Sequence, residues 1–131
     1  MKRLIQLLIL FTTLTCDAGH QRFYSYELKT QNFRDNLWPY IGYVVDKSNE
    51  LTVKNISSLK DEDFNHVPLD GMQFGYSSAH YWMKFTISNT SPKPVERFLE
   101  FTYSRLGTII LYTPNPDGGF DSVTTGNNLA Y

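Results

Sequence analysis

Apolar and polar residues alternate most regularly along residues 81–88. One face of this stretch carries Tyr81, Met83, Phe85 and Ile87, and the other carries Trp82, Lys84, Thr86 and Ser88. A period of two is the pattern of a β-strand that buries one of its faces. The sequence therefore predicts a strand here, with the odd-numbered face toward the core.

Two more strands are expected directly after this one. Residues 89–94 contain Pro92 and Pro94, which donate no ladder hydrogen bond, so the first strand should end there. The alternation resumes over residues 97–104, and residues 108–112 are apolar at both parities, as in a strand covered on two sides. Short connections between three neighbouring strands favour antiparallel pairing.

The preceding segment also has a β pattern. Residues 41–46 are rich in β-formers and lead into a polar turn at residues 46–50, and residues 51–56 alternate again, which predicts a hairpin. One short helical turn is expected over residues 57–64, with Ser58 as its N-cap. Residues 67–76 are expected to form a loop.

Beyond the third predicted strand, residues 114–119 have the composition of a tight turn, and residues 120–124 should begin another strand. Several short strands separated by turn residues are typical of a sandwich or barrel. The pattern as a whole predicts an all-β fold, an antiparallel β-sandwich.

The N-terminus has the pattern of an export signal. Lys2 and Arg3 precede an apolar run at residues 4–14, and small residues lie near Ala18. The run is shorter than the roughly 20 residues that a membrane-spanning helix needs. We therefore expect a cleaved signal peptide at residues 1–18 and one exported domain at residues 19–131. Lipidation of Cys16 is the alternative, although its neighbouring threonines fit a lipobox poorly.

Composition narrows the classes of function. The chain has 131 residues, the length of a single domain, and its formal net charge of -1 gives no basic field for nucleic acid. Aromatic residues make up 15% of the chain, which suits a β core and also suits the flat faces of sugars. Cleavage of the signal would remove Cys16, the only cysteine, and exclude a disulfide.

No catalytic or cofactor motif is present. The three histidines are scattered, and the chain has neither a Gly-x-Ser-x-Gly elbow nor a Gly-rich phosphate loop. The acidic run Asp61, Glu62 and Asp63 is expected to be a solvated turn rather than a cation site, because hard cations need several converging oxygens. We therefore expect no enzymatic activity, no cofactor and no bound metal.

Three segments together resemble a known family. They are Trp-x-Lys-Phe-x-Ile-x-Asn at residues 82–89, Leu-Glu-Phe at residues 99–101, and Ile-x-Leu-Tyr at residues 109–112. This combination resembles the type 2 extracellular domain of bacterial seven-transmembrane receptors with diverse intracellular signalling modules (7TMR-DISM). The resemblance extends over residues 37–126.

The resemblance implies a jelly-roll β-sandwich that senses carbohydrate or another small ligand in the periplasm. In such receptors the domain precedes seven membrane helices and an output module, a histidine kinase or a diguanylate cyclase. The family continues beyond the position of Tyr131 with further strands and the membrane helices. We therefore expect either a truncated piece of a receptor gene or a stand-alone exported fragment, with a sandwich incomplete at its C-terminus.

Trp82 is the main candidate for a ligand contact. It shares its strand face with Lys84, and an aromatic plate beside hydrogen-bonding groups is how a sugar is often bound. The alternative is that Trp82 packs beneath a second layer, as tryptophan often does. Tyr76, His80 and Arg105 are further candidates, because they lie on predicted loops at the ends of the core strands.

Three functions follow from these observations. The first is a non-catalytic periplasmic sensory domain that binds a carbohydrate-like ligand. The second is an accessory sugar-binding domain of a glycoside hydrolase, which an attached catalytic domain would identify. The third is a structural module whose exposed sheet edge pairs with a partner strand.

Overall fold

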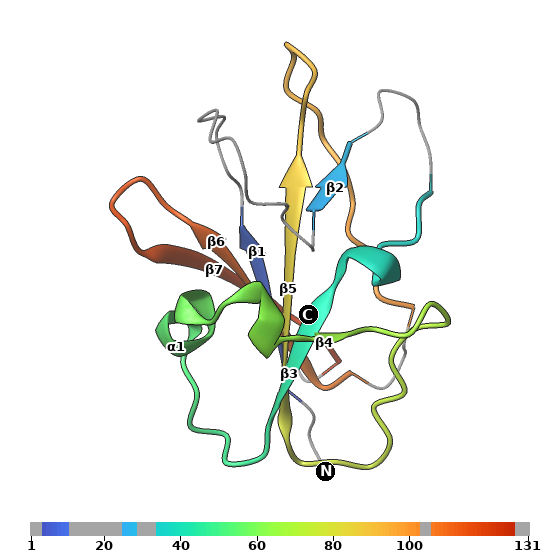
Figure 1. The fold of residues 1–131 in the computed structure, drawn as a ribbon, viewed down its shortest axis with the longest axis vertical. Coiled ribbons are helices and arrows are strands. Elements are labelled where there is room, and N and C mark those ends of the chain that lie inside the picture. Colours follow the sequence, from blue (N-terminus) through green and yellow to red (C-terminus); the bar gives the residue numbers. More distant parts are fainter. Residues whose placement is uncertain (1–3, 11–24, 29–33, 103–105, 128–131) are drawn as a thin grey trace.

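The computed structural model describes residues 4–10, 25–28, 34–102 and 106–127. In this part of the chain seven strands form one sheet with the order β4-β3-β5-β1-β6-β7, and β2 also pairs with β5 (Figure 1). The strands are β1 (Leu4–Leu10), β2 (Ser25–Glu27), β3 (Gly42–Asp46), β4 (Asn65–His66), β5 (His80–Ser88), β6 (Thr108–Pro114) and β7 (Phe120–Thr125). The all-β class is confirmed, and the jelly-roll connectivity stays a prediction.

The long strand β5 is the centre of the sheet and confirms the strand predicted from the alternation. On one side it pairs antiparallel with β3, where Val44 lies opposite Trp82. On the other side it pairs parallel with β1. Thr86 is paired with both Leu10 and Ser25, so β2 must join β5 on the β3 side, beyond the last residue that β3 covers.

The strand β1 separates β5 from β6. It runs parallel to both, and Leu7 lies opposite Met83 on one side and Leu111 on the other. The outer edge of β6 pairs antiparallel with β7, as the predicted turn at residues 114–119 requires. Residues 94–102 form no strand, so the strand predicted at residues 97–104 is wrong for its described part; residues 103–104 lie outside the described residues.

The predicted hairpin partner of β3 is a helix instead. Residues 53–58 form α1 (Val53–Ser58), and Thr52 caps it: the Thr52 hydroxyl accepts a bond from the Asn55 amide at 3.4 Å, and the Asn55 side chain accepts one from the Thr52 amide at 2.9 Å. This reciprocal cap satisfies amides that a helix start leaves free. Ile56 is fully buried and, with the partly buried Val53, packs this short helix against the sheet.

Two 3-10 turns complete the described elements, η1 (Trp38–Tyr40) and η2 (Asp61–Asp63). The helical turn predicted for residues 57–64 is thus found only at η2, and Ser58 ends α1 rather than capping a new helix. Residues 67–76 form a loop, as predicted. None of the helices in the described ranges has the length and apolar character needed to cross a membrane.

The turn after β3 is organised by a buried carboxylate. Asp46 is 3% exposed, and its side chain accepts bonds from the Ser48 hydroxyl at 2.8 Å, the Asn49 amide at 2.9 Å and the Leu51 amide at 2.9 Å. Asn49 has a positive φ of 60°, which asparagine tolerates better than most residues. The predicted turn at residues 46–50 is confirmed.

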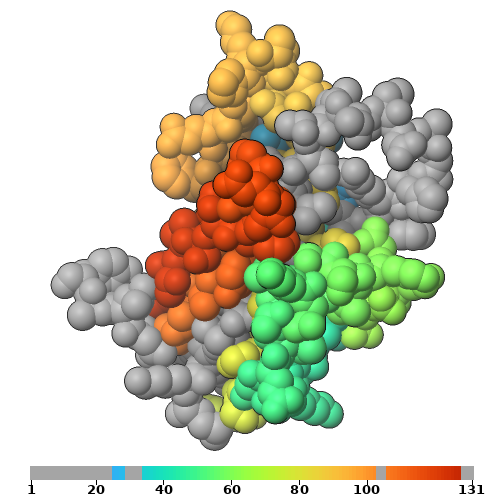
Figure 2. All heavy atoms as spheres, turned by 90° about the vertical axis from the view of Figure 1, so that its left-hand side faces the viewer, coloured from blue at the N-terminus to red at the C-terminus, as the bar shows by residue number. Residues whose placement is uncertain are grey.

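Both faces of the sheet are covered. The odd-numbered face of β5 packs on loop residues; the buried members of this cluster are Ile41, Val67, Phe74, Met83, Phe85, Leu106 and Ile109. The even-numbered face packs on α1 and its flanks through Ile56, Phe64 and Trp82. The β6–β7 hairpin lies beside the segment that carries α1 (Figure 2). The odd-numbered face is therefore a core face, as predicted, but the opposite face is buried as well.

Candidate functional site

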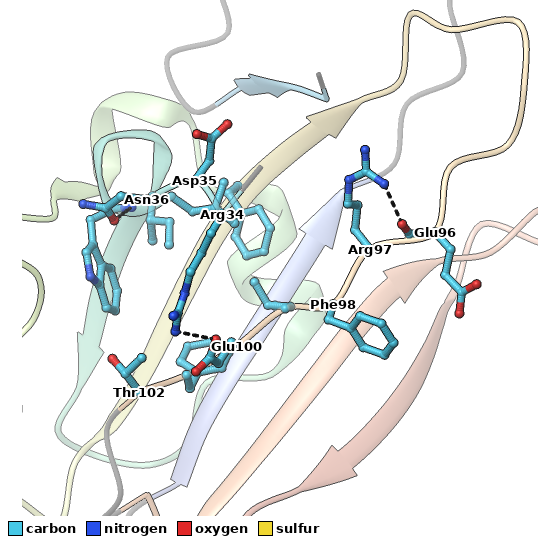
Figure 3. Close-up of a pocket in the computed structure, with 14 residues that line it drawn as sticks. Arg34, Asp35, Asn36, Glu96, Arg97, Phe98, Glu100 and Thr102 are labelled. Carbon is cyan, nitrogen blue, oxygen red and sulfur yellow. Dashed lines mark hydrogen bonds and ion pairs between the residues drawn. The ribbon is translucent and has the colours of Figure 1, made fainter. Parts of the chain in front are cut away.

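A pocket of about 840 Å³ lies over the odd-numbered face of β5. One wall is formed by residues 34–38 and the other by residues 96–102 (Figure 3). The buried side chains of Phe85 on β5 and of Ile41, just before β3, also line the pocket. The two walls are some 60 positions apart in the sequence. Concave sites with mixed apolar and polar linings are where small ligands usually bind.

The first wall is held in place by Asn36. Its side-chain oxygen accepts a hydrogen bond from the Trp38 amide at 3.0 Å, which is the local turn that asparagine favours. Its side-chain nitrogen donates to the Leu69 carbonyl at 3.4 Å and ties the wall to the next loop. Pro39 then follows inside η1, where its missing amide costs nothing.

The Trp38 side chain packs against the backbone of Gly71. Gly71 has a φ of +97°, and a Cβ atom at this position would lie 2.8 Å from Trp38 Nε1. The half-buried indole thus lies directly against the backbone of residue 71, where any side chain would displace it. The loop at residues 67–76 therefore fixes an aromatic ring that lines the pocket.

Asp35 is fixed by the strand below it. The Tyr26 hydroxyl donates a hydrogen bond to Asp35 Oδ2, and the Tyr26 ring packs edge-on to Tyr40 with centroids 5.3 Å apart. The bond to Asp35, with burial as the second cause, raises the pKa of Tyr26 to about 12. Tyr26 therefore stays protonated at neutral pH and remains a donor that orients this carboxylate.

An ion pair joins the two walls. Arg34 Nη2 lies 2.7 Å from Glu100 Oε2, and the two side chains are 79% and 61% exposed. Figure 3 shows the Arg34 side chain reaching from its own wall to Glu100 on the other. Such exposed pairs contribute about 0–1 kcal/mol, so a ligand with its own polar groups can replace this contact at small cost.

The second wall carries an exposed aromatic ring and a second arginine. Phe98 is 94% exposed, while Arg97 Nη1 donates to the Glu96 carbonyl at 2.8 Å. Phe101 is half-buried and packs on the odd-face cluster, which keeps this segment against the sheet. The rim of the pocket thus offers guanidinium donors beside apolar ring faces.

The pocket combines hydrogen-bonding groups of both signs with aromatic rings. Two arginines, three carboxylates and one amide line it together with Trp38, Phe98 and Phe101. A polyhydroxylated molecule matches this mixture, because its hydroxyls bond donors and acceptors while its C–H faces contact rings. No cluster of three or more His, Cys, Asp or Glu suited to a metal occurs in the described ranges.

None of the predicted ligand residues that the structure describes lines this pocket. Trp82 is 1% exposed and lies in the cluster with Ile56 and Phe64, stacked on Tyr112 with ring centroids 5.9 Å apart. This position fits the alternative in which Trp82 packs beneath a second layer. Its Nε1 is buried without a partner among the described residues, so its ligand role stays a prediction that requires α1 to move.

The remaining predicted residues are dispersed. Lys84 Nζ lies 2.9 Å from Asp61 Oδ1 and 5.0 Å from the centre of the Phe64 ring, on the α1 face of the sheet. Tyr76 is 83% exposed on its loop, and His80 begins β5 with its amide bonded to Asn49 Oδ1 at 2.8 Å. Arg105 lies outside the described residues. Their shared role as a binding site stays a prediction.

Sequence reasoning missed the first wall of the pocket. Residues 34–38 carry no strand periodicity, and their only local signal is Asn36 two positions before a Trp-Pro pair, which indicates a turn that presents an aromatic ring. The sequence predicts a strand over residues 97–104, which does not identify the second wall of the pocket. The contact between the two segments has no local signature at all.

Comparison with known families and proteins gives one match. The model of the family described as 7TMR-DISM extracellular 2 matches residues 39–131, well over half of the chain. No curated protein and no solved structure matches this chain. The matched range includes the second wall and β5, whose Phe85 lines the pocket, and it begins directly after Trp38.

Proposed function

This chain belongs to the 7TMR-DISM extracellular 2 family, the periplasmic sensory domains of membrane receptors, and from this premise we propose that it binds a carbohydrate-like ligand. The observation that carries the proposal is the pocket between residues 34–38 and 96–102, with the Arg34–Glu100 pair across it. The domain would act by binding and not by catalysis. In a full receptor the ligand would bias the membrane helices and a histidine kinase or diguanylate cyclase, provided it binds two receptor states with different affinity.

The make-up of the pocket supports a sugar over a purely apolar ligand. Charged groups come from both walls, and the aromatic rings of Trp38 and Phe98 line the same pocket. The walls are joined by an exposed ion pair, which a ligand can open without losing core packing. A ligand that replaces this pair would draw on residues from both segments and so connect them.

Export is part of the same proposal. Lys2, Arg3 and the apolar run before Ala18 fit a signal peptide at residues 1–18, and a periplasmic position is where the family senses its ligands. Family membership favours the receptor over an accessory domain of a glycoside hydrolase. An attached domain with paired carboxylates would reverse that preference.

The proposal is tested by titrating the purified chain with a panel of neutral and acidic oligosaccharides by isothermal titration calorimetry. For any sugar that binds, Trp38→Ala and Arg34→Ala should each weaken binding by about 30-fold, the effect of losing a contact worth about 2 kcal/mol. Tyr76→Ala is the matched control, because it removes an exposed aromatic ring outside the pocket.

Three results would count against the proposal. Absence of binding across the panel would contradict a carbohydrate ligand. Binding that depends on Tyr76 but not on Trp38 would move the site to the loop residues predicted from the sequence. Binding that survives all three substitutions would exclude the pocket, provided that circular dichroism shows each variant to be folded.

A further inference from the structure

Arg34 binds Glu100 with only part of its hydrogen-bonding capacity. The two side chains share a single bond, from Nη2 to Oε2 at 2.7 Å. A guanidinium group has five N–H donors, and its strong complexes with carboxylates use two parallel bonds. The remaining donors of Arg34 have no partner among the described residues. A carboxylate that is free to approach both Nη atoms would therefore bind Arg34 more strongly than Glu100 does.

The other two carboxylates that line the pocket do not compete for Arg34. Asp35 accepts a hydrogen bond from the Tyr26 hydroxyl, and Figure 3 shows its carboxylate directed away from the Arg34 guanidinium. Glu96, on the second wall, also points away from Arg34 in this view. Once Glu100 moves aside, none of the described carboxylates neutralises the charge of Arg34.

Glu100 can move aside without disturbing the core. Its side chain is 61% exposed and that of Arg34 is 79% exposed, so breaking their contact costs little. Phe101, the next residue, is half-buried and packs on the odd-face cluster. The backbone of the second wall therefore stays against the sheet while the Glu100 side chain turns toward solvent.

We propose that Glu100 occupies the place of an acidic group of the ligand, and that the ligand is an acidic saccharide whose carboxylate replaces Glu100 on Arg34. This inference rests on the proposed function, because it narrows the class of carbohydrate that the same pocket binds. Arg34 is the residue that determines specificity, since its planar group binds a carboxylate through two bonds. Glu100 is an internal competitor that the ligand must displace.

The exchange favours an acidic over a neutral saccharide. A neutral sugar that separates the pair leaves Arg34 and Glu100 each with uncharged partners, and bonds between two charged groups are replaced by weaker ones. An acidic sugar exchanges one carboxylate on Arg34 for another and adds a second bond. The hydroxyls and C–H faces of the same sugar remain available to the polar groups and to the rings of Trp38 and Phe98 that line the pocket.

The inference is tested with ligands that differ only in charge. The probes are disaccharides and trisaccharides of glucuronic, galacturonic and mannuronic acid, each compared with its methyl ester by isothermal titration calorimetry. We expect at least one acid to bind the wild-type chain about fivefold or more tighter than its ester, because the ester accepts fewer and weaker bonds from Arg34. The difference should shrink at high salt.

Removal of the internal competitor gives the sharper result. Glu100→Gln should tighten binding of the acid by about three- to tenfold, since Arg34 no longer has to leave a carboxylate, and should change binding of the ester by less than about twofold. Glu96→Gln is the matched control, because it makes the same change of charge on the same wall at a side chain that points away from Arg34. It should change either affinity by less than about twofold.

A second variant tests Arg34 without removing its charge. Lysine keeps the cation but binds a carboxylate as a point charge, without two parallel bonds. Arg34→Lys should therefore lower the preference for the acid over its ester by at least about threefold. Circular dichroism checks that each variant is folded.

Four outcomes would overturn the inference. Esters or neutral sugars that bind the wild-type chain as tightly as the acids would contradict the acidic ligand and leave the carbohydrate proposal standing. Weaker binding of both forms by Glu100→Gln would show that the ion pair only holds the two walls together. Equal tightening by Glu96→Gln would reduce the effect to net charge. Absence of binding by every neutral and acidic saccharide would overturn the carbohydrate proposal together with this inference.

Discussion

Replacing the buried carboxylate of Asp46 by an amide should destabilise the fold in a manner that depends on pH. Burial alone would raise the pKa of Asp46, but the bonds from Ser48, Leu51, Asn49 and Glu50 together outweigh burial and hold the pKa below its ordinary value. The ionised form is therefore favoured in the folded state. Its stabilising effect is fully present above the unfolded pKa of about 3.9 and is lost as the pH falls through the lower folded pKa.

The size of the effect follows from the contacts. In Asp46→Asn the amide oxygen can still accept the bonds from Ser48 and Asn49, which both reach Oδ1, but the new NH₂ group then faces the Leu51 amide, which lies 2.9 Å from Oδ2. A buried amide left unpaired costs about 1–3 kcal/mol, and two charge-assisted bonds become neutral ones. The free energy of unfolding at pH 7 should fall by about 2–4 kcal/mol.

Urea unfolding followed by tryptophan fluorescence at pH 7 and at pH 3 would measure this difference. We expect the gap between wild type and Asp46→Asn to shrink at pH 3, where the wild-type carboxyl begins to take up a proton. Asp117→Asn is the control, because Asp117 is exposed in a turn, and it should change stability by less than about 0.5 kcal/mol. A loss at pH 7 no larger than that of the control, or one unchanged at pH 3, would refute the reasoning.

Two further substitutions test the pocket wall and the α1 face. Gly71→Ala should push the Trp38 ring from its seat, lowering stability by about 1–3 kcal/mol and shifting the tryptophan emission, since a Cβ would lie 2.8 Å from the indole nitrogen. A double-mutant cycle with Lys84→Met and Asp61→Asn should give a coupling energy above about 1 kcal/mol in urea unfolding, because these side chains are only 13% and 28% exposed.

The Gly71 substitution and the Lys84–Asp61 cycle each have a matched control within the chain. Gly118 has a φ of +79°, and no atom lies within 4 Å of the place that a Cβ would occupy, so Gly118→Ala isolates the backbone cost and should leave the emission unchanged. Equal effects at both glycines would exclude the contact with Trp38. The Lys60–Glu62 pair, with side chains 79% and 75% exposed, should couple by less than about 0.5 kcal/mol. Equal coupling in the two pairs would show that burial does not matter here.

Local sequence patterns predicted the strands correctly where nothing in the segment itself competes with the strand. The alternation at residues 81–88, the β-rich residues 41–46 and the apolar residues 108–112 each correspond to a strand, and the turns that follow β3 and β6 lie where their polar residues indicated. These signals hold because side chains alternate across a strand whatever its neighbours are.

The same kind of pattern failed where a competing local interaction was stronger. Residues 51–56 alternate, yet they do not form a strand. The reciprocal bonds between Thr52 and Asn55 begin α1 there, and burial of Ile56 against Trp82 stabilises the helix. Residues 97–102 also alternate, but Phe101 and the Arg34–Glu100 pair hold them across the face of the sheet without strand pairing. Neither outcome can be decided by counting apolar positions within one segment.

By itself the sequence determined the β class, the main strands around β5, the export pattern at the N-terminus and, through three spaced motifs, the family. It did not determine what covers Trp82, where the pocket lies, or that Leu4–Leu10 pairs between β5 and β6. A short aliphatic run has the same composition in a signal peptide and in a buried strand. The physical reason is range: periodicity and capping act within a few residues, whereas second layers, pockets and strand neighbours are set by segments far apart that compete for the same surface.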